Sequence, residues 1–374
     1  MILRALENTI CKKLNKGMAI IVLGARQVGK TTLLKQIDLR LGQNSVFFNC
    51  DEPDIRELLT NACSANLKQL FGKYKTVLID EAQRVKNIGI TLKLINDEIP
   101  EVQLLVSGSS SFELSNEINE PLTGRKFEYF LYPFSFSELV ENYGLLNERR
   151  MLEERMIYGS YPGIVVNYED RLELLTNLVS SYLYKDVFNF QDVRKPEILQ
   201  LILEALALQI GNEVSYHELA GMVKTDVQTV IRYIDLLEKT FVIFRLRALS
   251  RNVRTELKKG RKIYFYDNGV RNALIRNFSP LRLRTDTGAL WENFLVSERI
   301  KRNSYALHYC NNFFWRTVQQ QEIDYIEEYG GKFYAYEFKW NTKKSVNFSK
   351  TFTHAYPDCE TKVISNENYV EFLS

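Results

Sequence analysis

MAIIVLGARQVGKTTLLKQI, residues 18–37, runs from an apolar stretch through a glycine-bounded loop into a segment with helical spacing. The loop, Gly24 to Thr31, fits the pattern G-x-x-x-x-G-K-[ST]. Glycines at these places let the backbone curl so that its N–H groups point at phosphates, at the positive end of the following helix. The stretch therefore predicts a buried strand, a phosphate-binding loop and a helix, as in an α/β domain with a parallel sheet.

This loop has the residues that binding of ATP with Mg²⁺ requires. Lys30 is expected to reach the β- and γ-phosphates, and the hydroxyl of Thr31 is expected to ligate Mg²⁺. The expected nucleotide-binding residues are Gly24, Ala25, Arg26, Gln27, Val28, Gly29, Lys30, Thr31 and Thr32.

Two further apolar runs predict buried strands that end in polar residues. The run KTVLIDE, residues 75–81, ends in Asp80, which can hold Mg²⁺ through water, and Glu81, which can polarise the water that attacks the γ-phosphorus. The run VQLLVSGSS, residues 102–110, ends in small hydroxyls, of which Ser109 is the candidate for sensing the γ-phosphate or orienting that water. A serine-rich turn without a catalytic role is the alternative for Ser109.

The composition is that of an ordinary soluble globular protein. Of the 374 residues, 25% are charged and 45% are apolar, and the net charge of +3 is too small by itself to indicate nucleic-acid binding. The five cysteines include no C-x-x-C pair, which favours reduced thiols in a cytoplasm. No apolar run approaches the roughly 20 residues that span a bilayer, and no signal peptide opens the chain. We therefore expect a cytoplasmic protein without a membrane partner.

The motifs GARQVGKTTLL, TVLIDEAQ, LLVSGSSSFEL, PLTGRKFEYFLYPFSFSEL and YGSYPGIV occur in this order along the chain. In them the chain resembles, over essentially its whole length, a family of prokaryotic predicted AAA-type ATPases with a C-terminal region of poorly defined role. The resemblance implies that Arg125, just before the fifth core strand, acts as an arginine finger in the site of a neighbouring copy, and hence that the chain forms a homo-oligomer. A local salt bridge is the alternative for Arg125. Residues 136–195, which have a helical pattern, would supply the lid of such an ATPase.

Residues 196–280 have the pattern of a winged helix-turn-helix. An amphipathic helix, ILQLILEALALQI, is followed by HELAGMV, with Ser215 as its N-cap, and by DVQTVIRYIDLLEKT, with Asp226 as its N-cap. Apolar residues keep helical spacing in the last of these segments, so the opposite face is polar. The residues left on that outward face are Lys224, Gln228, Thr229 and Arg232.

Basic residues are concentrated between and within the two wing strands, FVIFRLRAL and RKIYFYD. Across residues 245–262 eight basic residues accompany one acid, Glu256; they are Arg245, Arg247, Arg251, Arg254, Lys258, Lys259, Arg261 and Lys262. This local charge suits contacts to DNA phosphates, which supply affinity without sequence reading. The residues expected to contact DNA are Gln228, Thr229, Arg232, Arg251, Arg254, Lys258 and Lys259. A protein-contact surface or a solvated loop is the alternative.

EIDYIEEYGGKFYAYEFKW, residues 322–340, predicts a hairpin, because Gly-Gly between two β-favouring runs supplies the two positive φ angles of a tight turn. A turn at Gly330 and Gly331 sets Tyr329 opposite Lys332, Asp324 opposite Glu337 and Glu322 opposite Lys339. Facing β-carbons lie only about 5 Å apart, so two opposite carboxylates call for a raised pKa or for a cation between them.

Residues 281–374 resemble a PD-(D/E)XK nuclease-like domain, which has an α/β restriction-endonuclease-like fold. The resemblance rests on a helix with Glu292, a strand, a strand with Asp324, and a strand with Glu337 and Lys339. It implies that Asp324 and Glu337 hold Mg²⁺ with help from Glu292, and that Lys339 stabilises the attacking hydroxide. Such a site suits phosphodiester cleavage, which needs a metal-polarised phosphoryl group and an activated water. A salt bridge from Lys339 to a glutamate is the alternative, and it needs no metal.

These patterns predict an α/β chain with a P-loop AAA-type core at 1–135, a helical lid at 136–195, a winged helix at 196–280 and a nuclease-like domain at 281–374. We expect an ATPase that couples hydrolysis of ATP to ADP with DNA binding or processing. The alternative is a nucleotide-gated protein-interaction switch with a catalytically silent nuclease-like domain. A small-molecule kinase is disfavoured, because no acceptor-site motif is present and Glu81 suits water better than an alcohol.

Overall fold

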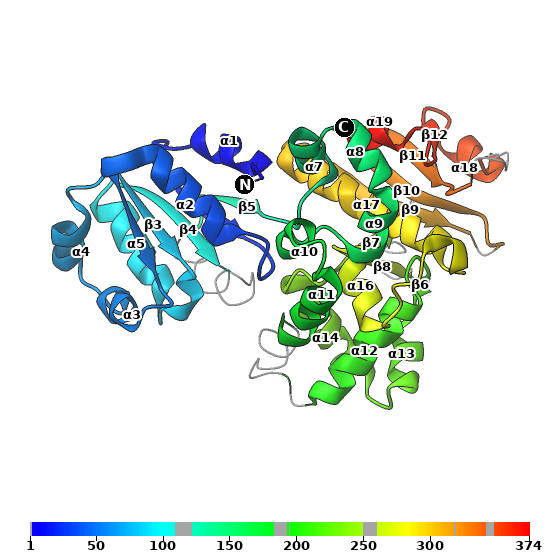
Figure 1. Cartoon of the computed structure of the whole chain (residues 1–374), viewed down its shortest axis with the longest axis horizontal. Helices are drawn as coiled ribbons and strands as arrows, with labels where there is room; N and C mark the ends of the chain where they lie inside the picture. Colours follow the sequence, from blue (N-terminus) through cyan, green and yellow to red (C-terminus); the bar gives the residue numbers. More distant parts are fainter. Residues whose placement is uncertain are drawn as a thin grey trace. The chain divides into compact units, whose positions relative to one another are not determined.

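The computed structural model describes residues 2–108, 122–182, 193, 195–249, 260–317, 319–341 and 348–374 (Figure 1). The chain forms two compact units, one of Met1–Phe134 with Lys239–Phe241 and one of Ser135–Glu238 with Val242–Ser374. The segments 136–195, 196–280 and 281–374 contribute nearly all of the second unit. Among the described residues, no helix combines the length and the apolar composition that crossing a bilayer requires.

The first unit is built on a five-stranded sheet in which neighbouring strands run parallel, in the order β2-β3-β4-β1-β5. Its strands are β1 (Ala19–Leu23), β2 (Ser45–Asn49), β3 (Thr76–Asp80), β4 (Gln103–Gly108) and β5 (Lys126–Phe130). Its described α-helices are α1 (Ala5–Cys11), α2 (Lys30–Leu41), α3 (Pro53–Leu59), α4 (Ser64–Phe71) and α5 (Ile88–Glu98). The three inner strands are buried along their whole length, as unbroken apolar runs predict for a parallel sheet. The predicted parallel α/β sheet is confirmed.

The carboxyl ends of β1, β3 and β4 lie at one edge of this sheet. The parallel register sets Leu105 of β4 beside both Ile20 of β1 and Leu78 of β3. Gly24 follows β1 at this edge, and Asp80 ends β3 there. Ligands of open α/β sheets bind outside the carboxyl ends of the strands, so this edge is where a nucleotide site is expected.

The second unit contains a seven-stranded mixed sheet in the order β12-β11-β10-β9-β7-β8-β6. Its strands are β6 (Glu213–Val214), β7 (Ile243–Ala248), β8 (Arg261–Phe265), β9 (Asn311–Arg316), β10 (Glu322–Tyr329), β11 (Lys332–Phe338) and β12 (Glu360–Ile364). The pairs β7–β9 and β11–β12 are parallel, and the other pairs are antiparallel. Because β7 pairs with β9, the strands of segments 196–280 and 281–374 belong to one sheet.

The helices of this unit come from both its first and its last parts. Those described are α7 (Phe136–Tyr143), α8 (Leu145–Arg150), α9 (Leu152–Tyr158), α10 (Pro162–Val166), α11 (Arg171–Tyr182), α12 (Pro196–Leu208), α13 (Tyr216–Met222), α14 (Val227–Lys239), α16 (Asn268–Leu274), α17 (Thr287–Tyr305), α18 (Lys350–Ala355) and α19 (Tyr369–Leu373). The predicted N-caps of α13 and α14 are confirmed. Ser215 Oγ accepts a hydrogen bond from the Glu218 N–H at 3.3 Å, and Asp226 Oδ1 accepts one from the Thr229 N–H at 2.8 Å.

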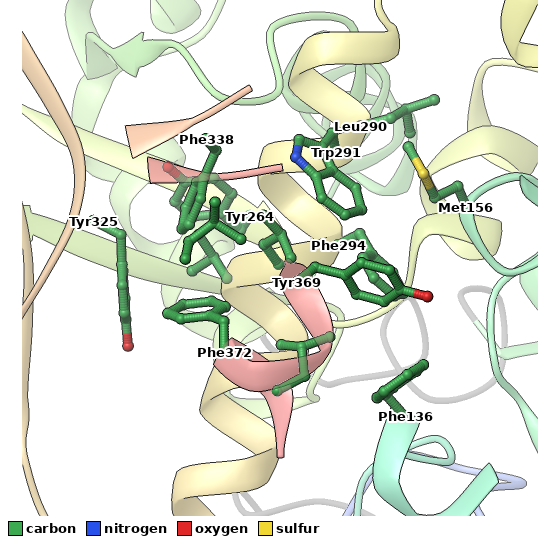
Figure 2. Packing of buried hydrophobic residues seen from close by; sticks show 14 of the residues in the cluster. Phe136, Met156, Tyr264, Leu290, Trp291, Phe294, Tyr325, Phe338, Tyr369 and Phe372 are labelled. Carbon is green, nitrogen blue, oxygen red and sulfur yellow. The ribbon is translucent and has the colours of Figure 1, made fainter. Parts of the chain in front are cut away.

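One apolar core of the second unit gathers side chains that lie far apart in the sequence. Trp291 of α17 stacks on Phe294 with ring centroids 5.8 Å apart, and its ring meets the ring of Tyr369 of α19 edge-on at 5.6 Å. Figure 2 shows these rings together with Phe372 of α19 and Phe338 of β11. Helix α17 also packs against β8 and β11. This packing holds α17 against the sheet strands that carry the ionisable residues described below.

The predicted hairpin at Gly330 and Gly331 is confirmed. The two glycines have φ angles of 59° and 77°, which is the left-handed region that this turn requires. The ladder between β10 and β11 begins with Tyr329 opposite Lys332, as the sequence predicts.

Candidate nucleotide site and carboxylate cluster

The loop Gly24–Thr31 connects β1 to α2 and uses its two glycines for different reasons. Gly29 has a φ of 96°, which side chains other than glycine rarely adopt. Gly24 lies against the chain that follows β5, where an added β-carbon would stand 2.2 Å from the Leu131 carbonyl oxygen. Gly29 is therefore needed for its backbone conformation, and Gly24 is needed because another part of the backbone passes close to it.

Lys30 opens α2 with its side chain folded back over the loop. Its Nζ donates hydrogen bonds of 2.9 Å to the carbonyl oxygens of Gly24 and Ala25, and the residue is buried. The first N–H groups of α2 have no partner within the helix, so they and the ammonium group supply positive charge at one place. Thr31 is half-buried and Thr32 is exposed at this helix start.

Arg4 braces the loop from the N-terminal segment, and sequence reasoning missed it. Its guanidinium donates to the Val28 carbonyl oxygen at 2.5 Å and to the Tyr132 carbonyl oxygen at 2.6 Å. It also lies over the ring of Phe134, 4.8 Å from the centroid, and only 5% of the residue is exposed. The guanidinium thereby links the nucleotide-binding loop to the chain after β5.

Asp80 and Glu81 meet a serine of the neighbouring strand. Asp80 is buried at the end of β3, and its Oδ1 accepts a hydrogen bond from the hydroxyl of Ser107 in β4. The Glu81 N–H donates to the same hydroxyl at 3.4 Å, and the Gln83 amide donates to Glu81 Oε2 at 2.6 Å. The candidate Ser109 lies outside the described residues. The register explains why Ser107 meets Asp80, because Ile79 of β3 pairs with Val106 of β4 and the next residues are Asp80 and Ser107.

Arg125 lies beside the amino ends of the strands, whereas its own nucleotide-binding loop follows the carboxyl end of β1. It precedes β5, whose first residue, Lys126, pairs with Ala19 at the beginning of β1. Its guanidinium donates to both carboxylate oxygens of Asp97 at 2.7 and 2.8 Å, and 45% of its side chain is exposed. Arg125 therefore has the local ion pair that the alternative reading expects, at a surface position.

The candidate DNA-binding residues are described only in part. Gln228 and Arg232 are exposed on α14, whereas the Thr229 hydroxyl donates to the carboxylate of Asp226 at 2.7 Å. Arg251, Arg254, Lys258 and Lys259 lie outside the described residues. Two of the other basic residues of this region do not face solvent as expected: Arg245 pairs with Asp235 and Glu238, and Lys262 is buried.

Lys262 lies instead among the carboxylates of the second unit. Its Nζ is 2.8 Å from Glu292 Oε1 and 2.5 Å from Glu322 Oε1. The hydroxyl of Tyr264, two residues along β8 on the same face, donates to Glu292 Oε1 at 2.6 Å. Burial would lower the pKa of Lys262, but the nearby carboxylates outweigh burial and raise that pKa, so the group is an ammonium ion.

The structure brings Asp324, Glu337 and Lys339 together as the hairpin predicts. Lys339 Nζ lies 3.1 Å from Glu337 Oε2 and 4.0 Å from Asp324 Oδ2. Asp324 Oδ2 also accepts a hydrogen bond of 2.8 Å from the Phe338 N–H. The ladder between β10 and β11 extends only from Tyr329 opposite Lys332 to Tyr325 opposite Tyr336. It therefore includes neither of the two other predicted pairings, Asp324 opposite Glu337 and Glu322 opposite Lys339.

Three carboxyl groups near these lysines, those of Glu292, Asp324 and Glu337, have raised pKa values. Burial raises the pKa of Glu292 to about 7, with Lys262 opposing the rise and Asp324 adding to it. Burial and the charge of Asp324 raise the pKa of Glu337 to about 7, against the effect of Lys339. Burial also raises the pKa of Asp324. Part of the negative charge is therefore removed by protons near neutral pH.

Only one trio of metal-ligating side chains has mutually close ligand atoms among the described residues. It is His308, Cys310 and Glu327, whose atoms lie within 4.8 Å of one another. Glu327 already accepts two hydrogen bonds from Arg299, at 2.8 and 2.7 Å, and one from Asn303 at 2.5 Å. The guanidinium group thus neutralises Glu327 without a metal. Glu292, Asp324 and Glu337 do not form such a trio.

Comparisons with known proteins divide the chain into three matched segments. Residues 16–140 match the model of an AAA domain, residues 149–281 that of a domain of unknown function (DUF8612), and residues 287–371 that of another (DUF4143). An uncharacterized protein of Haemophilus influenzae is 25% identical over 280 residues, which are 68% of this chain and 68% of that protein. An uncharacterized protein of Mycobacterium tuberculosis is 26% identical over 348 residues, which are 90% of this chain and 74% of that protein.

Two solved structures show weak likeness. The structure of Drosophila ORC bound to AT-rich DNA and Cdc6 gives a TM-score of 0.26 at 10% identity, covering 73% of this chain and 90% of that chain. The Pif1 helicase from Candida albicans gives 0.26 at 13% identity, covering 48% of each chain. The segment that matches the AAA-domain model, residues 16–140, is also the segment that contains the parallel sheet and the glycine-bounded loop between β1 and α2.

Proposed function

We propose that this protein is an ATPase that binds ATP with Mg²⁺ at the loop Gly24–Thr31 and couples hydrolysis to DNA binding. The observation that carries the proposal is the meeting of this loop with the Asp80–Ser107 pair at one edge of a parallel sheet. Phosphates need cationic donors and N–H groups, which the loop supplies, and hydrolysis needs an oriented carboxylate, which β3 supplies.

Each residue has a role that its position allows. The loop amides and Lys30 bind the β- and γ-phosphates, and the hydrogen bonds of Lys30 to two loop carbonyls keep its ammonium at the loop. Thr31 and Asp80 would hold Mg²⁺, which neutralises phosphate charge when bound. Glu81 polarises the attacking water, and the Gln83 amide orients its carboxylate. Ser107 positions Asp80 and the Glu81 backbone.

The coupling to DNA is supported by the second unit. Helices α12, α13 and α14 with strands β6, β7 and β8 follow one another in the order helix, strand, helix, helix, strand, strand, and β8 pairs with both other strands. This order of elements supports the proposed winged helix, in which α14 would be the recognition helix. Its exposed Gln228 and Arg232 are the described side chains for that contact.

A second candidate, the nucleotide-gated protein-interaction switch, is favoured by the ion pair of Lys262 with Glu292. A nuclease-like site whose glutamate is already paired supports a protein-binding role more readily than DNA cleavage. Phosphate release from ATP with and without duplex DNA separates the two candidates. Stimulation by DNA supports coupling, and an unchanged rate supports the switch.

Two matched comparisons test the sites themselves. Lys30→Ala is expected to abolish ATP binding measured by calorimetry, whereas Lys35→Ala, an exposed lysine on the same helix, retains it. Lys258→Gln with Lys259→Gln is expected to weaken DNA retention at low salt, and Lys12→Gln with Lys16→Gln is the control that removes equal charge from exposed positions elsewhere. ATP binding by the Lys30 variant equal to that of the parent would contradict the proposed site.

A further inference from the structure

Four carboxyl groups and two ammonium groups form one cluster in the second unit. Glu292 comes from α17, Glu322 and Asp324 from β10, and Glu337 from β11. The cations are Lys262 of β8 and Lys339, which directly follows β11. The cluster thus connects one helix with three strands, and it includes every residue that the nuclease-like resemblance nominates for a metal.

Lys262 is more deeply placed in this cluster than Lys339. Its side chain is 1% exposed, against 36% for Lys339. The ring of Phe314 covers it, with Nζ 5.6 Å from the ring centroid. A lysine that is buried without acceptors is strongly destabilising, so this ammonium depends on Glu292 and Glu322 as much as they depend on it.

A divalent cation does not fit the same carboxylates in this arrangement. Mg²⁺ binds oxygen ligands at about 2.0–2.1 Å, which brings its ligand atoms close to one another. Among the described residues, Glu292, Asp324 and Glu337 do not form a group whose ligand atoms are placed to hold a metal ion. Each also has a hydrogen-bonded oxygen: Glu292 with Lys262 and Tyr264, Asp324 with the Phe338 N–H, and Glu337 with Lys339.

We propose that the ammonium of Lys262 is the resident cation of this cluster, and that the cluster binds no divalent metal while Lys262 is in place. The ion network then fastens β8 and β10 to α17, in place of the phosphodiesterase centre that the resemblance implies. This inference does not depend on ATP hydrolysis, since every residue in it lies in the second unit.

Binding of Mn²⁺, followed by electron paramagnetic resonance on the full chain, tests the inference. All variants carry Asp80→Asn, which removes the carboxylate that is expected to hold a metal in the nucleotide site, and no nucleotide is added. With Lys262 intact, Glu337→Gln is expected to leave Mn²⁺ binding unchanged. Lys262→Met is expected to tighten Mn²⁺ binding by roughly tenfold or more, because it removes a positive charge from the carboxylates. Adding Glu337→Gln to Lys262→Met is expected to abolish that gain.

Two results would overturn the inference. One is tight Mn²⁺ binding by the chain with Lys262 intact that disappears on Glu337→Gln, because the carboxylates would then hold a metal beside the ammonium. The other is a folded Lys262→Met variant that binds no more Mn²⁺ than its parent. If Lys262→Met fails to fold, the comparison between intact and Glu337→Gln chains still decides the question, since both retain Lys262.

Discussion

The hydroxyl of Ser107 donates a hydrogen bond to Oδ1 of Asp80 across the adjacent strands β4 and β3. Both residues are buried, so water contributes little to setting the direction of the carboxylate. Ser107→Ala is expected to lower kcat for ATP hydrolysis by about tenfold or more, because a hydrogen bond to a charged group contributes roughly 1.5–3 kcal/mol. The KM for ATP should change little, since the hydroxyl of Ser107 is hydrogen-bonded to Asp80 and to the Glu81 N–H. Steady-state phosphate release measures both constants.

Ser107→Thr is the control for this prediction, because it retains the hydroxyl. Ser109→Ala tests the original candidate from the same serine-rich stretch. If kcat falls for Ser109→Ala but stays at the parental value for Ser107→Ala, then Ser109, and not Ser107, is the serine that supports hydrolysis.

Gly159 and Gly163 belong to one motif, YGSYPGIV, but substituting alanine for each is expected to affect stability very differently. A β-carbon at Gly159 would lie 2.0 Å from Asp267 Oδ1, and the residue has a φ of 76°. A β-carbon at Gly163 would meet no atom within 4 Å. Gly159→Ala is expected to lower the free energy of unfolding by more than about 2 kcal/mol, and Gly163→Ala to change it by less than about 0.5 kcal/mol. Urea denaturation measures both, and equal effects would show that the Asp267 contact does not constrain this turn.

Arg4 is expected to support nucleotide binding without contacting the nucleotide. Its two hydrogen bonds, to Val28 and Tyr132, hold the loop against the chain after β5. Arg4→Ala should weaken ATP binding by about tenfold, since an unpaired buried carbonyl costs roughly 1–3 kcal/mol. Arg4→Lys should be intermediate, because one ammonium cannot reproduce the planar fork. Calorimetry with ATP checks this, with Arg40→Ala as a control at a mostly exposed arginine. Equal affinities for ATP in all variants would show that Arg4 does not support nucleotide binding.

The elements that could be predicted from the sequence are those whose signals are local. The loop at Gly24–Thr31 and the turn at Gly330 and Gly331 each depend on glycines at fixed spacing, and both form as predicted. Arg4 gave no such signal, because its partner Tyr132 lies 128 residues away. Lys262 was assigned to a basic surface because a count of basic residues in a segment does not show which way each side chain points. β8 lies between β6 and β7 in the sheet and is buried on both faces, so alternation could not show which residues face solvent.

Asp286 is expected to make stability depend on acid pH. Burial would raise its pKa, but hydrogen bonds from Arg284 and Arg271 outweigh burial and lower the pKa to about 2, from an ordinary value of 3.8. Because the pKa is lower in the folded chain, the carboxylate stabilises the fold above pH 3.8, and this stabilisation is lost as the pH falls toward 2. Asp286→Asn should therefore be less stable than the parent in urea at pH 7, and the difference should shrink toward pH 2. A difference that is the same at both pH values would exclude this linkage.

Arg125 is expected to act in the site of a neighbouring copy. It lies beside the amino ends of the strands, away from its own loop, and its exposed pair with Asp97 is of the kind that stabilises a fold only weakly. Arg125→Ala should therefore retain ATP binding in calorimetry and lose most of its hydrolysis. Lys30→Ala should also lose ATP hydrolysis, because its own nucleotide-binding loop lacks the lysine. Mixing the two inactive variants should restore part of the activity, because the Lys30→Ala copy supplies Arg125 to the intact loop of its neighbour. Asp97→Ala breaks the local pair while keeping Arg125, and hydrolysis should persist in it. If the mixture stays inactive while Asp97→Ala loses as much hydrolysis as Arg125→Ala, then Arg125 acts through its ion pair with Asp97 and not in the site of a neighbouring copy.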